Sequence, residues 1–348
     1  MNAASDLRIG VLGASGYIGA ELLRYIAGHP RAKLAWASAH SRAGERVDTV
    51  LPNLAGFIDG TFCDAQEAES RLGEVDAIFV ALPHNQSQEV IPRIAAAHPD
   101  LLVIDMAGDF RTNDPAGYAK FYKKEHQAPE LLSKFVYGFT EFQRDALKSA
   151  KLIANPGCFA TAMLVACSPL AKAGVLKGDV VITGITGSSG SGNKPIATTH
   201  HPERFSNLRS YKPLSHQHLL EVESFLRTLT SEDFRLQFVP QSGPIARGIF
   251  ATVVLPDRRP EDLNAIYEST YESEALITVR SGSPELRWVQ GTPRTFVGVA
   301  GADERGSAVF SVIDNLGKGA ASQGIQNLNV ASGLPETEGL MSLPGGYL

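Results

Sequence analysis

Residues 7–19 read Leu7-Arg8-Ile9-Gly10-Val11-Leu12-Gly13-Ala14-Ser15-Gly16-Tyr17-Ile18-Gly19, an apolar run that enters a glycine-rich turn. The residues that follow have the apolar spacing of a helix that stops near Gly28. Glycines in such a turn let the backbone approach a pyrophosphate, and the start of a helix offers N–H donors. The spacing G-x-x-G-x-x-G is a variant of the commoner G-x-G-x-x-G, so a purely structural turn is the alternative. The stretch predicts a nucleotide-binding domain whose phosphate site is formed by Gly13, Ser15, Gly16, Tyr17, Ile18 and Gly19.

Further apolar runs and one helix-like segment follow in alternation, over residues 34–39, 77–82, 88–97 (the helix) and 101–105. Continuous apolar strands that alternate with helices indicate a parallel sheet covered on both faces. After residue 158 the pattern changes to longer strands, over 180–185, 236–240, 248–255 and 308–313, with helices over 218–229 and 260–273. We therefore predict a Rossmann-type α/β domain, then an α+β domain with a mixed or antiparallel sheet, and a helical tail from residue 318.

The composition is that of an ordinary globular protein: 348 residues, 43% apolar and 20% charged. The net charge of −5, without any block of like charges, gives no support to nucleic-acid binding. No apolar run approaches the roughly 20 residues that a membrane helix needs, and the N-terminus lacks the features of a signal peptide. Three cysteines are too few and too scattered for a disulfide framework or a zinc site. We expect a cytoplasmic protein with reduced thiols.

The end of the second predicted strand reads Ser38-Ala39-His40-Ser41-Arg42. No acidic residue lies there to bind a ribose 2′-hydroxyl, whereas hydroxyls and an arginine suit a 2′-phosphate. The sequence therefore favours NADP(H) over NAD, bound by Ser38, Ser41 and Arg42. The alternative for Arg42 is a solvated loop charge.

Asn155-Pro156-Gly157-Cys158 is a tight turn that ends in a cysteine at the start of a predicted helix. Unpaired N–H groups and the positive end of the helix dipole lower the pKa of a thiol placed there and favour the thiolate. Cys158 is therefore the candidate nucleophile for covalent catalysis. The alternative is a free cysteine in an apolar core, which is how we interpret Cys63 and Cys167.

Two histidines and a glutamate lie at the start of the helix predicted over 218–229: His216, His218 and Glu221. A thiolate enzyme needs a general acid/base with a pKa near neutrality, and histidine supplies it. The i, i+2 spacing of the histidines would splay metal ligands apart on a helix, so we expect no metal site. A histidine without a catalytic role is the alternative for either ring.

A second glycine- and serine-rich loop, residues 186–194, follows a predicted strand. One interpretation is a flexible linker. The other is a loop that wraps the nicotinamide end of a cofactor or a phosphate, with Ser188 and Gly190 in the loop and Lys194 as counter-charge.

Two arginines, Arg111 and Arg247, lie beside apolar strands. Arginines so close to buried elements tend to bind carboxylate or phosphate groups, which makes both candidates for holding a substrate anion. A structural ion pair is the alternative for each.

Taken together, these motifs resemble those of the N-acetyl-γ-glutamyl-phosphate reductases, within the wider semialdehyde dehydrogenase group. The resemblance covers nearly the whole chain, and the order and spacing of individually modest motifs make it specific. The motifs are Gly13 to Arg24, Leu82-Pro83-His84, Asp109-Phe110-Arg111, Asn155 to Cys158, Tyr211-Lys212, His216-x-His218-x-x-Glu221, Arg247-Gly248 and Asp314-Asn315-Leu316-x-Lys318-Gly319-Ala320-Ala321.

The resemblance implies an NADPH-dependent enzyme of arginine biosynthesis that reduces a small acyl phosphate to a semialdehyde. It implies Cys158 as the nucleophile, His216 as the acid/base with His218 as the fallback, and Asn315 as the residue that orients the nicotinamide amide. Matching motifs assign further residues: Leu82, Pro83 and His84 to the cofactor, and Arg111, Asn155, Glu221 and Arg247 to the substrate. To the substrate residues we add Lys194, the counter-charge of the glycine- and serine-rich loop. The implied domains are 1–156 with 317–348 for NADP binding, the C-terminal helix packing back on it, and 157–316 for catalysis and assembly into a homodimer or homotetramer.

Some stretches resemble a sister branch instead: His200-His201-Pro202-Glu203-Arg204, Arg209-x-Tyr211-Lys212-Pro213 and Gln290-Gly291-Thr292. That branch reduces aminoadipyl or glutamyl phosphate attached to a small acidic amino-group carrier protein, so a carrier-bound substrate is the alternative. A non-catalytic NADP-sensing protein that keeps the fold is an alternative of a different class.

Overall fold

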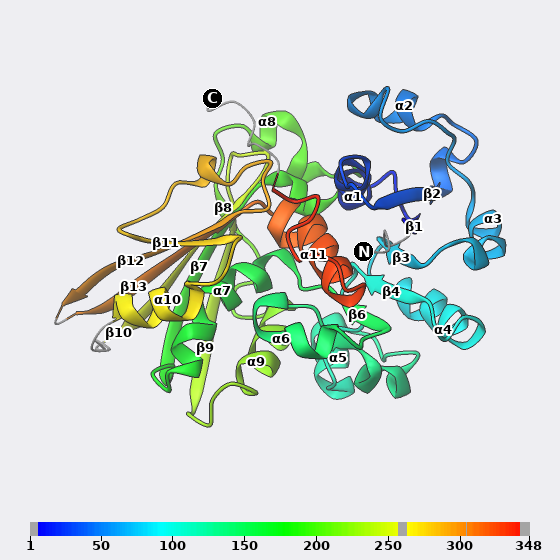
Figure 1. Cartoon of the computed structure of the whole chain (residues 1–348). Coiled ribbons are helices and arrows are strands. Elements are labelled where there is room, and N and C mark those ends of the chain that lie inside the picture. Colours follow the sequence, from blue (N-terminus) through cyan, green and yellow to red (C-terminus); the bar gives the residue numbers. More distant parts are fainter. Residues whose placement is uncertain (1–5, 257–262, 304, 342–348) are drawn as a thin grey trace. The chain divides into compact units, whose positions relative to one another are not determined.

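The structure is a computed structural model that describes residues 6–256, 263–303 and 305–341, and it divides into two compact units (Figure 1). Among these residues, unit 1 comprises 6–116, 124–156 and 320–341, and unit 2 comprises 117–123 and the described part of 157–319. The chain passes from unit 1 to unit 2 between Pro156 and Gly157. No helix in the described ranges combines the length and apolarity needed to cross a bilayer.

Unit 1 contains a six-stranded sheet in the order β2-β1-β3-β4-β6-β5, and every neighbouring pair is parallel. Its elements are β1 (Leu7–Leu12), α1 (Tyr17–Ala27), β2 (Ala32–Ser38), α2 (Val47–Val50), α3 (Ala65–Ser70), β3 (Ala77–Val80), α4 (Ser87–Ala97), β4 (Leu102–Asp105), β5 (Val136–Tyr137), α6 (Thr140–Leu147), β6 (Leu152–Ala154) and α11 (Ser322–Ala331). The strand order changes direction between β1 and β3, which is where doubly wound sheets bind ligands. The predicted Rossmann-type domain is confirmed.

The tail returns to unit 1 as α11, which packs on α1, α6 and β4. A π-helical turn, Gly317–Ala321, leads into it, so the helical tail predicted from residue 318 is correct. The buried residues of α11 include polar side chains. Asn327 Nδ2 donates to the carbonyl of Gly138 (2.9 Å), and Gln323 Nε2 donates to Thr140 Oγ1 (2.7 Å). These bonds satisfy backbone and hydroxyl groups that burial would otherwise leave unpaired.

Unit 2 contains a seven-stranded sheet in the order β11-β12-β13-β10-β7-β9-β8. Its elements are most of α5 (Pro115–Tyr122), α7 (Cys158–Lys172), β7 (Gly178–Thr186), α8 (His201–Arg204), β8 (Arg209–Ser210), α9 (His218–Leu226), β9 (Phe234–Ser242), β10 (Ile249–Pro256), α10 (Leu263–Tyr271), β11 (Ile277–Ser281), β12 (Thr295–Asp303) and β13 (Gly306–Ile313). The β7–β9 and β11–β12 pairs are parallel and the others antiparallel, as a mixed sheet requires. The predicted α+β domain is therefore confirmed.

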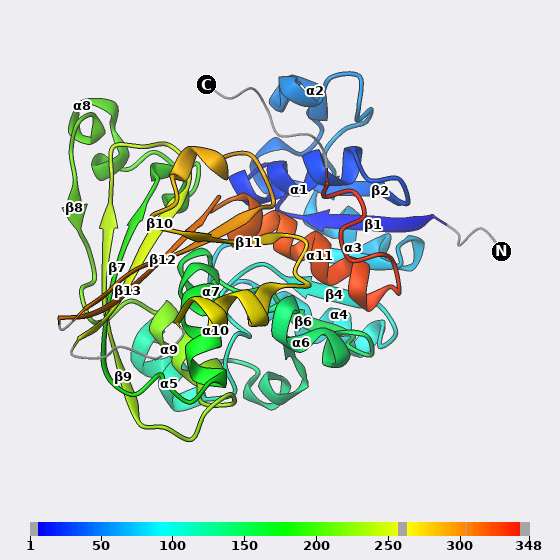
Figure 2. The same cartoon turned by 60° about the vertical axis from the view of Figure 1, so that its left-hand side comes forward.

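Helix α7 covers one face of this sheet (Figure 2). The helix is buried from Phe159 to Ala171. Gly184 of β7 makes the approach possible, because a Cβ there would lie 2.6 Å from the ring of Phe159. The start of α7 is thereby fixed against β7 by dense apolar packing.

Three strands of unit 2, β8, β11 and β12, were not predicted from the sequence. Gly298 interrupts the apolar run of β12, so the sequence pattern does not indicate a strand. The fold requires glycine at this position, because a Cβ there would lie 2.1 Å from the carbonyl oxygen of Gly282. The helix predicted over 260–273 is α10, which begins at Leu263, and residues 260–262 lie outside the described ranges.

Candidate active site

The phosphate turn lies between β1 and α1 in unit 1. Gly13 has a φ of +79°, and a Cβ there would lie 2.4 Å from the carbonyl oxygen of Ala81. A Cβ on Gly19 would lie 2.5 Å from the Cα of Ala14. No acidic residue lies in the first turn of α1, so its N–H groups and dipole suit an anion. The turn therefore fits a pyrophosphate.

The end of β2 lies beside this turn, since the carbonyl of Ser38 accepts a hydrogen bond from the N–H of Ala14 (2.8 Å). Ser41 and Arg42 belong to a short 3₁₀ turn. Arg42 is exposed, and its Nη1 lies 3.3 Å from Oε1 of Glu45. An exposed pair of this kind contributes little to stability, so the guanidinium can turn to a phosphate. These residues fit NADP(H).

Replacing Arg42 with alanine should weaken NADPH binding about tenfold, because a charge-assisted contact with the 2′-phosphate is lost. NADH lacks that phosphate and should bind the variant and the parent alike. Fluorescence titration of both nucleotides measures the difference. Arg46→Ala is the matched control, since Arg46 lies on the same segment and pairs with Asp48 (2.5 Å). An unchanged NADPH affinity would remove Arg42 from the site.

The loop after β3 carries Leu82, Pro83 and His84. A Cβ on Gly13 would lie 3.4 Å from Leu82 Cδ2, so Leu82 borders the phosphate turn. His84 Nδ1 accepts a hydrogen bond from the N–H of Gly108 (3.1 Å). The structure thus brings this loop beside the turn, within unit 1.

Arg111 and Asn155 are buried in the same unit, and their contacts are with the protein itself. Arg111 Nε donates to the carbonyl of Asn155 (2.7 Å) and Nη2 to that of Met106 (2.9 Å). Asn155 Nδ2 donates to the carbonyl of Ala320 (3.2 Å), and its Oδ1 accepts from Asn327 (3.0 Å). These contacts give both side chains a structural role, and their predicted substrate contacts stay predictions.

Cys158 is the first residue of α7, and Gly157 is the N-cap. Its side chain is partly exposed, whereas Cys63 and Cys167 are buried. Burial raises the pKa of the Cys167 thiol to about 12. Gly319 lies against Cys158, because a Cβ on Gly319 would be 2.9 Å from the Cβ of Cys158. Of the three cysteines, Cys158 alone combines access with a helix N-terminus, the setting that favours a thiolate.

Glu221 binds the turn that carries the cysteine. Its Oε2 accepts a hydrogen bond from the N–H of Gly157 (3.1 Å), and its Oε1 lies 3.8 Å from Nε2 of His218. His216 Nδ1 accepts from the N–H of His218 (3.2 Å), which leaves the proton of the neutral His216 ring on Nε2. Both rings are buried, with their centroids 4.5 Å apart. Unit 2 therefore brings the predicted histidines and Glu221 together.

Tyr211 belongs to this group, although no role was predicted for it. Its ring centroid lies 5.8 Å from that of His216. Burial, and secondly the charge of the Cys158 thiolate, raise the pKa of Tyr211 above its usual range. Tyr211 is thus a neutral hydroxyl close to the sulfur. Its place in the Tyr211-Lys212 motif was the signal available in the sequence.

Backbone hydrogen bonds hold the start of the glycine- and serine-rich loop against residues 245–248. The N–H groups of Gly187, Ser188 and Ser189 donate to the carbonyls of Gly248 (3.0 Å), Ile245 (2.9 Å) and Ala246 (3.0 Å). These bonds exclude the flexible linker. A Cβ on Gly190 would lie 3.5 Å from Thr186 Oγ1, and Lys194 is exposed at the end of the loop.

Asn315 connects this loop to β10. Its Oδ1 accepts from the N–H of Gly248 (2.6 Å), and its Nδ2 donates to Ser189 Oγ (3.0 Å). The amide is therefore fixed in direction, as a residue that orients a ligand must be.

Arg247 forms an ion pair with Asp314 (Nε to Oδ2, 2.6 Å), as the structural alternative for this arginine predicts. The Asp314 carboxylate is fully buried and also accepts from the N–H groups of Gly291 (2.5 Å), Leu316 (2.8 Å) and Gly317 (2.9 Å). Since Nε faces Asp314, the pair fixes the plane of the guanidinium, which remains partly exposed. Asp314 begins the motif of residues 314–321, and no role was predicted for it from the sequence.

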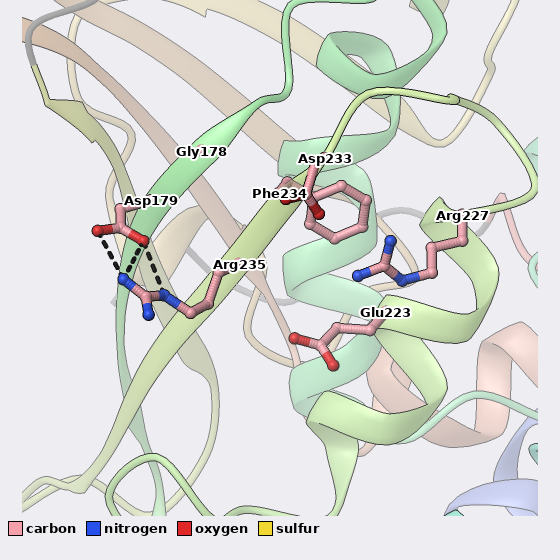
Figure 3. Close-up of a pocket in the computed structure, with 7 residues that line it drawn as sticks. All are labelled: Gly178, Asp179, Glu223, Arg227, Asp233, Phe234 and Arg235. Carbon is pink, nitrogen blue, oxygen red and sulfur yellow. Dashed lines mark hydrogen bonds and ion pairs between the residues drawn. The ribbon is translucent and has the colours of Figure 1, made fainter.

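A polar cavity of about 470 Å³ lies elsewhere in unit 2 (Figure 3), lined by Gly178, Asp179, Glu223, Arg227, Asp233, Phe234 and Arg235. It adjoins the start of β7, whereas the serine-rich loop follows the end of that strand. Asp179 and Arg235 are ion-paired (2.7 Å), and the Arg227 guanidinium lies 4.8 Å from the Phe234 ring centroid. The cavity holds none of the predicted site residues. Among the described residues, no three His, Cys, Asp or Glu side chains are grouped to hold a metal ion.

Comparison with known proteins gives concordant matches. The semialdehyde dehydrogenase NAD binding domain matches residues 8–150, and the dimerisation domain of the same group matches 158–315. N-acetyl-gamma-glutamyl-phosphate reductase of Bacillus cereus (strain ATCC 10987 / NRS 248) is 39% identical over 345 residues, covering 97% of this chain and 99% of its own. The protein of that name from Halorhodospira halophila is 40% identical over 344 residues, with 97% and 98% covered.

Solved structures agree on the fold. Aspartate semialdehyde dehydrogenase II of Vibrio cholerae, complexed with ASA, matches with a TM-score of 0.72 at 17% identity, covering 94% of this chain and 99% of its own. Aspartate semialdehyde dehydrogenase of Candida albicans, with NADP, has a TM-score of 0.68 at 17% identity, with 94% and 99% covered.

Proposed function

The chain belongs to the semialdehyde dehydrogenase family, and we propose that it reduces N-acetyl-γ-glutamyl phosphate to N-acetylglutamate semialdehyde and phosphate with NADPH, a step of arginine biosynthesis. The observation that carries the proposal is the accessible Cys158 at the start of α7, close to Tyr211, whose ring centroid lies 5.8 Å from that of His216. Identity of 39–40% to reductases of that name, along 97% of the chain, supports the substrate.

Cys158 would act as the nucleophile. Its sulfur bonds to the acyl carbon as the bond from that carbon to the phosphate oxygen breaks, and inorganic phosphate leaves. N–H groups at the start of α7 suit the oxygen that becomes negatively charged. When bound, NADPH supplies the hydride that takes the thioester to the aldehyde level. The sulfur then leaves as a thiolate, which restores Cys158.

His216 is our proposed acid/base, and His218 the fallback. In its neutral form His216 carries its proton on Nε2, where it can donate to the carbonyl oxygen of the substrate. To take up the thiol proton, His216 must release the hydrogen bond at Nδ1. His218 lies next to the Glu221 carboxylate and so can hold a proton as an imidazolium.

Arg247 is our candidate for the substrate carboxylate or phosphate, with Lys194 as a second cation. Its support is the fixed guanidinium plane, which presents N–H donors in a fork. We assign cofactor binding to residues 1–156 and 317–348, and catalysis and assembly to 157–316. We expect the enzyme in the cytoplasm, where a catalytic thiol stays reduced.

We further propose that the enzyme is a homodimer or homotetramer assembled through unit 2. Side chains of β10 alternate between buried and partly exposed, and β13 follows the same alternation over its central residues. The buried set faces α7. The partly exposed set includes Phe250 and Phe310, whose rings are 5.8 Å apart. An apolar sheet face of this kind is typical of an interface between subunits. Light scattering should therefore give a multiple of the chain mass, and a monomer would contradict the assembly.

The reaction is tested most simply in reverse. The purified protein should form NADPH from NADP⁺, phosphate and N-acetylglutamate semialdehyde, and omission of phosphate should stop the reaction. Turnover of a carrier-protein conjugate, with none of the free compound, would establish the carrier-bound alternative. NADPH binding without turnover of either would establish the NADP-sensing alternative.

A further inference from the structure

Three polar side chains are sealed inside unit 1 at the carboxyl end of β4: Ser87, Asp105 and Asp109 have no exposed surface. Two carboxylates enclosed together repel each other and lose hydration, so such a pair persists when hydrogen bonds or a shared proton compensate. Nothing in the proposed reaction uses these groups. Their hydrogen bonds connect β4 and the segment after it to residues 85–88.

Asp109 binds the segment of residues 82–88, which we call the cofactor loop. Its Oδ1 accepts from the N–H of Asn85 (2.9 Å), and its Oδ2 accepts from the Ser87 hydroxyl (2.8 Å) and the N–H of Gln88 (3.3 Å). Asn85 has a φ of +68°, a left-handed conformation that needs such support. The residue at the N-cap of α4, Gln86, makes no side-chain cap. Asp109 therefore caps α4 from a distant segment.

The Ser87 hydroxyl lies between the two acids. Its Oγ is 2.8 Å from Asp109 Oδ2 and 3.3 Å from Asp105 Oδ2. A hydroxyl has one proton to donate, and Asp109 is its nearer acceptor. The Asp105 oxygen can bond to Ser87 only as a donor, which requires a proton on Asp105. The geometry thus describes a chain in which Asp105 donates to Ser87 and Ser87 donates to Asp109.

The charges around Asp105 agree with this arrangement. Burial, and secondly the charge of Asp109, raise the pKa of Asp105 to about 7. Arg111 opposes the rise, although its guanidinium donates to backbone carbonyls. Two histidines also lie close: His126 Nε2 is 2.9 Å from the Asp109 carbonyl, and His84 binds Gly108. Burial lowers the pKa of His126, which keeps that ring neutral near pH 7.

We propose that Asp109 is a positioning residue for NADP(H), and that the Asp105–Ser87–Asp109 chain holds the cofactor loop in its binding position while Asp105 keeps its proton. Loss of that proton turns the Asp105–Ser87 contact into repulsion and loosens the loop. The inference rests on the proposed assignment of Leu82, Pro83 and His84 to the cofactor. It predicts that NADP(H) affinity falls as the pH rises through about 7.

The experiment compares the wild type with Asp105→Asn, Asp109→Asn and a control, Asp76→Asn. An amide at 105 donates to Ser87 at every pH. The NADPH affinity of the Asp105→Asn variant should therefore not fall with rising pH as that of the wild type does. An amide at 109 has a single acceptor oxygen, so it cannot accept from Asn85 on one side and from Ser87 and Gln88 on the other. This variant should raise the Kd roughly tenfold at low pH. Asp76 pairs with Arg8 at the opposite end of β3 (2.9 Å) and should behave as wild type.

The measurement is NADPH fluorescence titration without substrate, from about pH 6 to 9. We expect the wild-type Kd to rise about fivefold or more across this range relative to Asp105→Asn. Titration of the 2′-phosphate of NADPH itself affects all four proteins equally and cancels in the comparison. Equal pH dependence in the wild type and Asp105→Asn would overturn the proposal, as would an unchanged Kd in Asp109→Asn.

Amide hydrogen exchange of the cofactor-free proteins gives a second readout. The N–H groups of Asn85 and Gln88 should exchange faster in Asp109→Asn, and faster in the wild type than in Asp105→Asn above pH 7, after correction for intrinsic rates. If no variant binds NADPH, the proposed cofactor assignment fails and exchange still tests the loop. If Asp109→Asn does not fold, the Asp105→Asn comparison decides. Equal protection in the wild type and Asp105→Asn would contradict the proton chain.

Discussion

Replacing Cys158 with serine is expected to lower kcat by at least about 10⁴-fold, because a hydroxyl at this position is neither ionised near neutral pH nor a comparable leaving group. NADPH affinity should not change, since Cys158 is not among the residues assigned to the cofactor and the substitution replaces only its sulfur with oxygen. Steady-state rates of NADPH formation, together with fluorescence titration, measure both quantities.

Labelling with iodoacetamide provides the control for this variant. The wild type should take up one equivalent and lose activity, because Cys63 and Cys167 are buried and burial raises the pKa of both thiols. The serine variant should take up none. Turnover retained at more than a few per cent in the variant would refute a thioester mechanism, whatever the labelling result.

Replacing His216 with asparagine should lower kcat by about 10²- to 10⁴-fold, the usual contribution of a general acid/base. Asparagine Oδ1 can still accept the hydrogen bond from the N–H of His218, so the start of α9 should keep its conformation. The pH dependence of kcat should lose the limb that the imidazole provides. A simple loss of folding would instead lower the yield of active protein without changing that profile.

His218→Asn is the matched variant for this test. The two rings lie in the same cluster and are equally enclosed, so general disruption should affect both variants alike. We expect the His218 variant to lose less activity, because its ring faces Glu221, which supports the Gly157 turn. If His218→Asn lowers kcat more than His216→Asn does, and His216→Asn keeps the pH dependence of kcat, then His218 is the acid/base and His216 is not.

Strands β1 to β4 and helices α1 and α4 of the first domain could be predicted from the sequence, because local signals and the fold agree there. The short strands β5 and β6 and the helices α2, α3 and α6 were not predicted. Helix α1 begins at Tyr17 and ends at Ala27, between the glycines that the pattern indicates. In unit 2 the pattern and the packing disagree. Gly298 looks like a break, whereas the sheet needs a residue without a side chain beside Gly282. β11 contains polar residues such as Thr278 and Arg280 and gives a weak signal.

In the site, the sequence indicates residue types but not their partners. Arg111 was predicted to hold an anion, and its Nε and Nη2 also donate to the carbonyls of Asn155 and Met106, which the sequence does not indicate. The contacts of Glu221 with Gly157, and of Asp314 with Arg247, join residues that are 64 and 67 positions apart. No local periodicity connects such residues, so these contacts become visible once the chain is folded.

The return of α11 to unit 1 has a consequence for how this protein is made. The helix packs against α1, α6 and β4, which are all synthesised long before it. While a ribosome is still adding residues 157–319, the growing polypeptide exposes the surface that α11 will cover, including Gly138 and Thr140, whose polar groups await Gln323 and Asn327. The half translated first is therefore completed last, and the surface that α11 covers stays exposed on the nascent chain until its final segment emerges.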